Sequence, residues 1–92
     1  MWYTYSLQSL KNNRLYIGIT DNLKRRLSEH NSMRGGRYTQ KFTPFKLIFY
    51  EAFLNKKDAY KAEKFLKSGY DREVLKDKLK NYFDSTAPSS NG

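Results

Sequence analysis

The sequence predicts a small α+β domain with the order strand, strand, helix, strand, helix, helix and a small antiparallel sheet. The chain has 92 residues, which is enough for one modest core and too few for a second. Aromatic residues make up 16% of the chain, whereas disordered basic segments are poor in them. Because strand-like apolar segments also alternate with segments of helical periodicity, we expect the chain to fold.

The first two strands are expected to form an antiparallel hairpin. Residues 2–7 alternate aromatic or apolar side chains with small polar ones, which indicates a strand. Lys11, Asn12 and Asn13 suit a turn, since asparagine tolerates positive φ. Residues 15–19 are again apolar and aromatic and predict the second strand.

A helix and a third strand are predicted next. Thr20 and Asp21 offer an N-cap for a helix over residues 22–31. Residues 32–43 contain two adjacent glycines and no periodicity, so they are expected to be a loop. Residues 45–53 are rich in Phe, Ile and Tyr and predict the third strand.

Two further helices complete the predicted domain. Asn55 is expected to cap a helix over residues 56–68, and Gly69 stands at the usual position after its end. Asp71 is expected to cap a third helix that runs to about residue 83. The domain would therefore span residues 1–83, and residues 84–92 would be a disordered tail.

The composition restricts the partners and the chemistry. Eighteen Lys and Arg against nine Asp and Glu give a net charge of +9, which favours a polyanionic partner. The absence of cysteine excludes disulfides, thiolate zinc sites and a cysteine nucleophile. The apolar runs are too short for a membrane-spanning helix, and the N-terminus lacks the basic segment of a signal peptide.

The positive charge is concentrated in the first half of the chain. Residues 1–50 carry nine Lys and Arg against two acids. We therefore expect the first helix and the loop after it to bind nucleic acid. The candidate contacts are Lys24, Arg25, Arg34, Arg37 and Lys41, with Lys67 from the second helix; an alternative binding surface is formed by Lys56, Lys57, Lys64 and Lys67.

The first helix places two polar side chains beside its core stripe. At about 100° per residue, Leu23 and Leu27 form the stripe, Arg26 and His30 border it, and Glu29 points away. Arg26 and His30 either pack structurally, with the guanidinium reaching solvent and the imidazole satisfied, or belong to a functional site.

Glu63 and two tyrosines are further candidates. Glu63 lies at the edge of the apolar face of the second helix, where a charge needs a partner. That partner is either Arg26, in a structural ion pair, or a divalent metal such as Mg²⁺, which keeps several waters and takes phosphate oxygens. Tyr5 and Tyr16, on adjacent strands, either pack in the core or converge on this carboxylate.

The chain resembles the GIY-YIG nuclease superfamily, above all its small stand-alone bacterial members, which are related to the nuclease domain of the bacterial excision-repair endonuclease. The similarity spans residues 2–83. The first motif, Tyr-Thr-Tyr, lacks the family's Gly and Ile but keeps its last tyrosine, and the family's C-terminal motif has only Asn81 as a candidate. The residues that carry the resemblance are Tyr3-Thr4-Tyr5, Tyr16-Ile17-Gly18, Arg26, His30 and Glu63.

The resemblance implies a three-stranded antiparallel sheet flanked by helices and phosphodiester hydrolysis assisted by one Mg²⁺ or Mn²⁺. Tyr16 would be the general base and Tyr5 would assist it. Arg26 would bind the scissile phosphate, His30 would support the tyrosines, and Glu63 would hold the metal. A phenol, with an ordinary pKa of about 10, needs a nearby cation to act as a base at neutral pH.

We therefore expect a metal-dependent DNA endonuclease that acts in repair or recombination. It would be cytoplasmic and nucleoid-associated, bind duplex or branched DNA, and need neither a membrane nor a small-molecule cofactor. We expect weak sequence preference or recognition of DNA structure, unless a targeting protein partner directs it. Two alternatives stay open: a non-catalytic nucleic-acid-binding module with the nuclease fold, and a small basic RNA-associated protein, which would explain the charge but not the motifs.

Overall fold

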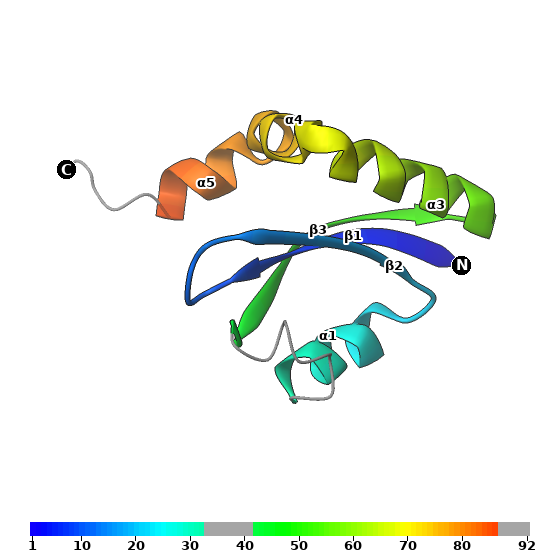
Figure 1. The fold of residues 1–92 in the computed structure, drawn as a ribbon, viewed down its shortest axis with the longest axis horizontal. Coiled ribbons are helices and arrows are strands. Elements are labelled where there is room, and N and C mark those ends of the chain that lie inside the picture. The colour runs from blue at the N-terminus through cyan, green and yellow to red at the C-terminus, as the bar shows by residue number, and fades with distance from the viewer. Residues whose placement is uncertain (33–41, 87–92) are drawn as a thin grey trace.

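The computed structural model describes residues 1–32 and 42–86. Strands β1 (Trp2–Ser9), β2 (Leu15–Thr20) and β3 (Phe45–Phe53) form one antiparallel sheet in the order β2-β1-β3, so β1 is central (Figure 1). The predicted α+β fold class and element order are confirmed, and β3 has the bounds that the sequence predicts. Within the described residues, no helix is long and apolar enough to cross a membrane.

The helices cover both faces of the sheet. Helix α1 (Leu23–Asn31) packs on one face, and a continuous run of helices covers the other (Figure 1). This run comprises α3 (Lys56–Phe65), the π-helical turn η1 (Leu66–Tyr70), α4 (Asp71–Lys78) and α5 (Lys80–Thr86).

The two faces of the central strand pack differently. On the α1 side, Tyr5, Leu7 and Phe45 form a buried apolar cluster, against which Leu23 and Leu27 of α1 pack. The other side of β1 is polar, with Thr4, Ser6 and Gln8 buried beneath the helices. Thr4 and Gln8 serve as anchors for those helices, because a buried polar group without a partner is costly.

Two hydrogen bonds attach the second helical layer to β1. Thr4 Oγ1 donates to the carbonyl oxygen of Ala59 at 2.6 Å, and Ala59 is fully buried against the sheet. At the other end of the strand, the Tyr82 hydroxyl donates to Gln8 Oε1 at 2.6 Å. The first bond fixes α3, and with it the orientation of Glu63.

Helix α1 begins one residue later than the sequence predicts. Its N-cap is Asn22, whose Oδ1 accepts from the backbone N–H of Arg25 at 2.9 Å. Thr20 Oγ1 instead accepts from the backbone N–H of Asn22, and Asp21 pairs with the Arg25 guanidinium at 2.9 Å. Both predicted caps are therefore wrong, because their oxygens are engaged elsewhere.

The C-terminal helices also differ from the prediction. Helix α3 passes at Leu66 into η1, where Gly69 has a φ of 105°, as expected of a glycine after a helix end. The single third helix is divided into α4, which carries the buried Leu75, and α5, whose Tyr82 hydroxyl bonds to Gln8 of β1. Helix α5 continues to Thr86, so part of the expected tail is helical, and residues 87–92 lie outside the described residues.

Gly18 lies directly opposite Tyr5 in the sheet register. A Cβ atom on Gly18 would lie 2.5 Å from the Tyr5 hydroxyl oxygen and 2.7 Å from its Cζ. The phenol ring thus occupies the space that a side chain at position 18 would need, and glycine is required there by this close approach.

We predict that Gly18→Ala lowers the free energy of unfolding by about 1–3 kcal/mol, the usual cost of overpacking, as measured by urea denaturation. Combining it with Tyr5→Leu should give a loss smaller than the sum of the two single losses, because the shorter side chain frees the space. Additive losses, or an unchanged stability in Gly18→Ala, would contradict this account.

Candidate active site

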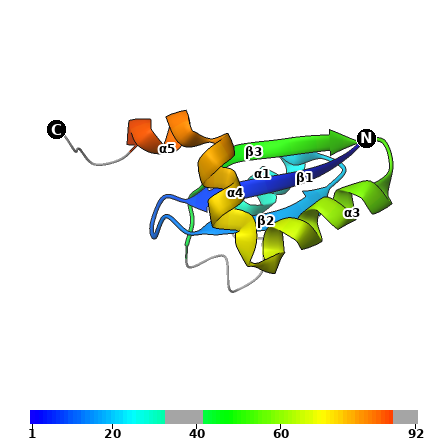
Figure 2. The ribbon, with the colours of Figure 1, turned by 90° about the horizontal axis from the view of Figure 1, so that it is seen from above.

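A cavity of about 300 Å³ at the β2 edge of the sheet brings the candidate catalytic residues together. Helix α3 starts next to the end of β3 and runs towards the β2 side of the sheet (Figure 2). Ile17, Gly18 and Ile19 of β2 contribute to the walls. The other lining residues are the five predicted catalytic residues Tyr5, Tyr16, Arg26, His30 and Glu63, together with Lys67.

Tyr5 is the central group of this cavity. Its hydroxyl oxygen accepts a hydrogen bond from Arg26 Nε at 3.3 Å and lies 3.5 Å from His30 Nε2. Arg26 and His30 come from successive turns of α1 and approach the phenol from the same face of the sheet. Their position beside the core stripe of α1, which the sequence predicts, is what brings both of them to Tyr5.

His30 is buried and only 7% exposed. Burial lowers the pKa of its imidazole, and the nearby Arg26 cation lowers that pKa further, outweighing the opposite effect of Glu29. Its ring meets Phe45 edge-on at 5.6 Å between centroids, and within the described residues Nδ1 has no hydrogen-bond partner. A neutral imidazole can accept the phenol proton of Tyr5 through Nε2.

Arg26 is held by two partners. The hydrogen bond to Tyr5 raises the pKa of its guanidinium, and so does the hydrogen bond from Nη1 to Glu29 Oε1, at 3.1 Å. Glu29, which the sequence predicts to point away from the core stripe, thus binds Arg26 at the border of that stripe. The i,i+3 spacing of Arg26 and Glu29 is the signal that indicates this pair.

Glu63 pairs with Lys67 and not with Arg26. Lys67 Nζ lies 3.0 Å from Glu63 Oε2, and the Glu63 side chain is only 14% exposed. The predicted structural ion pair between Glu63 and Arg26 is therefore wrong, since each has a nearer partner on its own helix. Lys67, predicted as a nucleic-acid contact, belongs to the cavity, and its i,i+4 spacing from Glu63 is the sequence signal for this pair.

Within the part of the chain that the structure describes, Glu63 is the only acid that lines the cavity. Among the same residues, no group of three or more His, Cys, Asp or Glu could enclose a metal ion. A single, partly accessible carboxylate does fit Mg²⁺ or Mn²⁺ that keeps its waters and takes phosphate oxygens from a substrate. It does not fit a closed structural metal site.

Tyr16 stands on the same face of the sheet as Tyr5, since its register partner is Leu7. Its ring meets Phe45 edge-on at 5.1 Å and stacks with Phe42 at 6.3 Å between centroids. The two tyrosines thus both pack in the core cluster and line the cavity, which combines the two alternatives that the sequence left open.

The other predicted contacts lie outside the cavity. Lys24 and Arg25 are exposed on α1, and Arg25 is bound by Asp21 at 2.9 Å and Glu29 at 3.7 Å. Asn81 is exposed on α5 and does not line the cavity. Three predicted nucleic-acid contacts lie outside the described residues: Arg34, Arg37 and Lys41.

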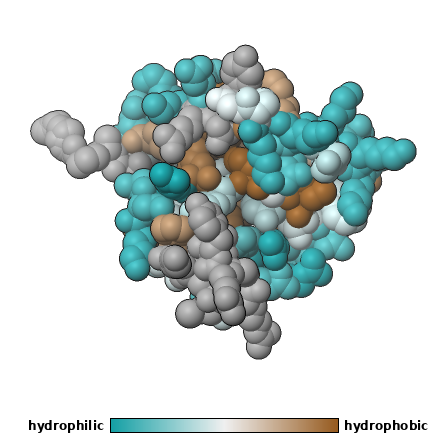
Figure 3. Space-filling model, in the orientation of Figure 1, coloured by the Kyte–Doolittle hydropathy of each residue, from teal (hydrophilic) through white to brown (hydrophobic). Residues whose placement is uncertain are grey.

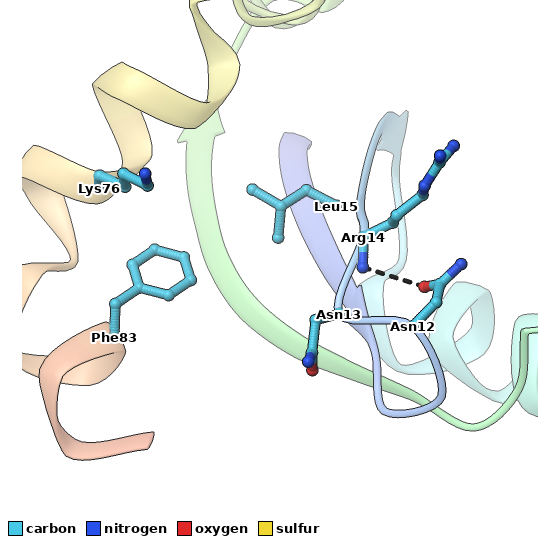
Figure 4. A pocket seen from close by; sticks show the side chains of 6 residues that line it. All are labelled: Asn12, Asn13, Arg14, Leu15, Lys76 and Phe83. Carbon is cyan, nitrogen blue, oxygen red and sulfur yellow. Dashed lines mark hydrogen bonds between the residues drawn. The ribbon is translucent and has the colours of Figure 1, made fainter. Parts of the chain in front are cut away.

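A second cavity, of about 320 Å³, lies between the β1–β2 turn and helices α4 and α5 (Figure 4). Lys76 and Phe83 line its helical side and Leu15 lines the strand side, while Asn12 Oδ1 accepts from the backbone N–H of Arg14 at 3.0 Å. Among residues 1–32 and 42–86, no acid, histidine or tyrosine lines it.

Comparisons with known proteins identify the family of this chain. The family model for the GIY-YIG catalytic domain matches residues 1–78, which include all five candidate catalytic residues. A UPF0213 protein of Pediococcus acidilactici is 48% identical over 64 residues, which are 67% of this chain and 65% of that protein, so the match spans less than two thirds of its length. A UPF0213 protein of Streptococcus pneumoniae is 40% identical over 96 residues, and this match covers 91% of this chain and 91% of that protein.

A solved structure gives the same result. The solution structure of a UPF0213 protein from Bacillus halodurans matches with a TM-score of 0.52 and 33% identity, over 99% of this chain and 100% of that one. The order of the motifs, the three-stranded sheet and the meeting of the motif residues in one cavity all point to the same family. The chain belongs to the GIY-YIG catalytic domain family, which supports a nuclease-type function.

Proposed function

We propose that this protein is a divalent-metal-dependent endonuclease that hydrolyses phosphodiester bonds in DNA, in repair or recombination. The observation that supports this most strongly is the meeting of two phenols, a guanidinium, a buried imidazole and a carboxylate in one cavity. A binding module would need the cations but would have no use for a carboxylate inside a basic surface.

Arg26 is the phosphate-binding group. Its side chain is 39% exposed, so the guanidinium can meet a phosphate while Nε stays on Tyr5 and Nη1 on Glu29. These two hydrogen bonds orient the planar group before substrate arrives. A preoriented cation stabilises the negative charge that develops on the phosphate in the transition state.

Tyr16 is the general base. It acts after its own hydroxyl proton has passed to solvent, and its oxygen then takes a proton from the attacking water, while Arg26 neutralises charge at the phosphate. Tyr5 orients the water, and its own hydroxyl proton can move to the neutral Nε2 of His30, 3.5 Å away. Glu63 holds the divalent cation, which when bound supplies further neutralisation of the phosphate charge.

The decisive test incubates the purified protein with plasmid, single-stranded and branched DNA, in Mg²⁺, Mn²⁺ or EDTA. Cleavage that needs the metal supports the proposal. Tight binding to all three DNA forms with no cleavage in either metal would contradict it and leave a non-catalytic binding module.

We predict that Tyr16→Phe slows single-turnover cleavage by about 10²–10⁴-fold, the usual contribution of a general base. DNA affinity should barely change, because the loss lies in the transition state. Tyr50→Phe is the matched control, since Tyr50 is exposed on β3 at the other edge of the sheet. This variant should cleave DNA at the wild-type rate. Full activity in Tyr16→Phe would eliminate this phenol as the base.

We predict that Glu63→Ala abolishes cleavage and leaves DNA binding within a few-fold. Lys67→Ala should raise the affinity for Mn²⁺ by about two- to fivefold, because Lys67 competes with the metal for the Glu63 carboxylate. Electron paramagnetic resonance of free Mn²⁺ measures this affinity directly, and Lys64→Ala is the control with equal loss of charge. Equal Mn²⁺ affinity in Glu63→Ala and the wild type would rule out Glu63 as the metal ligand.

We predict that the only histidine of the chain, His30, titrates below its ordinary pKa of about 6.5. Because the unfolded chain then binds more protons than the folded one, this contribution to stability is complete above pH ~6.5 and is lost as the pH falls towards the folded pKa. Nuclear magnetic resonance of the imidazole checks the midpoint.

The variant Arg26→Gln should raise that midpoint, since the Arg26 cation lowers the pKa of His30. Urea unfolding at two pH values, one above and one below about 6.5, should show a smaller pH dependence in His30→Gln than in the wild type. A midpoint at or above the ordinary value would contradict a neutral buried imidazole.

A further inference from the structure

The outer face of helix α3 carries lysines and aromatic side chains side by side. Ala59 and Leu66 are buried against the rest of the molecule. At about 100° per residue, the opposite side of the helix presents a continuous arc of exposed side chains. We call this arc the α3 stripe; it consists of Lys57, Tyr60, Lys61, Lys64 and Phe65.

About half of the surface of each aromatic residue of the stripe is exposed to solvent. Tyr60 is 51% exposed and Phe65 is 55% exposed. The Lys64 ammonium lies 5.4 Å from the centroid of the Tyr60 ring and leaves half of that side chain uncovered. Single exposed aromatics are common, but a pair spaced among lysines on one helix face is the pattern of surfaces that bind unpaired nucleic acid strands.

The stripe is uniformly positive. The two acids of α3 both lie off it: Asp58 falls beyond its Phe65 side, and Glu63 faces the cavity with Lys67. Hydrophilic side chains predominate at the end of the molecule where α3 lies, with some apolar surface between them (Figure 3, right). Such a surface is complementary in charge to a phosphate backbone.

The stripe adjoins the candidate active site. Tyr60 precedes Glu63 by three residues, so the two side chains are neighbours on the helix surface. Lys67, which pairs with Glu63, lines the cavity one turn further on. A strand that leaves the cavity past Glu63 therefore reaches Tyr60 and then the stripe lysines.

We propose that the α3 stripe binds an unpaired strand of the substrate next to the scissile phosphate. One base stacks on Tyr60, and the stripe lysines contact the adjoining phosphates. Stacking on a protein side chain requires a base that is not held in a duplex, so the substrate has a single-stranded segment at this point. This inference rests on the proposed nuclease function, of which it defines the substrate class.

The first test measures binding without cleavage. Fluorescence anisotropy of a labelled single-stranded oligonucleotide, in EDTA, should show that Tyr60→Ala weakens binding about tenfold. Tyr60→Phe should retain the wild-type affinity, because it keeps the ring. Tyr50→Ala is the matched control, since Tyr50 is 55% exposed but lies on the far edge strand β3.

The affinity of Tyr60→Ala for a duplex of the same sequence should lie within about twofold of the wild-type affinity, because paired bases cannot stack on the ring. Thermal melting of each variant verifies that the fold is intact. Wild-type affinity of Tyr60→Ala for the single strand, or an equal loss in Tyr50→Ala, would overturn the proposal.

The second test removes the charge of the stripe. Replacing its three lysines by alanine should reduce the slope of log affinity against log salt on single strands, by roughly 0.7 for each phosphate that a lysine no longer neutralises. A control with the same change of net charge carries Lys76→Ala, Lys78→Ala and Lys80→Ala on α4 and α5 and should keep the slope. Equal slopes in the two triple variants would refute the stripe as the binding surface.

The two proposals fail separately. If the wild type cleaves no DNA but Tyr60→Ala loses single-strand binding, the nuclease function is wrong and the stripe is a strand-binding surface. If the wild type cleaves DNA and the stripe variants bind as their controls do, the nuclease function stands and the strand binds elsewhere.

Discussion

The close approach of the Tyr5 ring to the backbone of Gly18 is the constraint on which the rest of the site depends. Opposite residues on neighbouring strands have side chains about 5 Å apart, so a side chain at position 18 would occupy the place of the phenol. Because glycine stands there, the Tyr5 hydroxyl can lie over β2 and meet Arg26 and His30. Gly18 and Tyr5 together line the cavity at this edge of the sheet.

The site lies at an edge because its groups come from the two faces of the sheet. Tyr5 and Tyr16 extend from the face covered by α1. Glu63 comes from α3, which the hydrogen bond from Thr4 to Ala59 attaches to the opposite face. Since β2 is an edge strand, the groups from the two faces can meet around it, which the middle of a sheet would not permit.

Two ion pairs give Arg26 and Glu63 separate partners, so these two charged residues of the site do not pair with each other. Glu29 holds Arg26, and Lys67 holds Glu63, each within its own helix. The partly exposed pair of Arg26 and Glu29 contributes little to stability but orients the guanidinium. The pair of Lys67 and Glu63 compensates the charge of the cavity carboxylate, which is only 14% exposed. The cationic α3 stripe continues from the second pair, so the basic character of the chain reaches the site from α3.

The sequence by itself determined the fold class, the order of the elements, the bounds of β3 and the five candidate residues that line the cavity. Periodicity and turn residues predict the helices and strands, because these signals act over a few neighbouring positions. The spaced motifs identify the candidate site residues. Tertiary structure decided the partners of Arg26 and Glu63, the Asn22 cap of α1 and the division of the last helix at Leu79. These depend on which of several competing oxygens and cations lies nearest once the helices are packed, and on long-range contacts such as the bond from Tyr82 to Gln8, which no local pattern specifies.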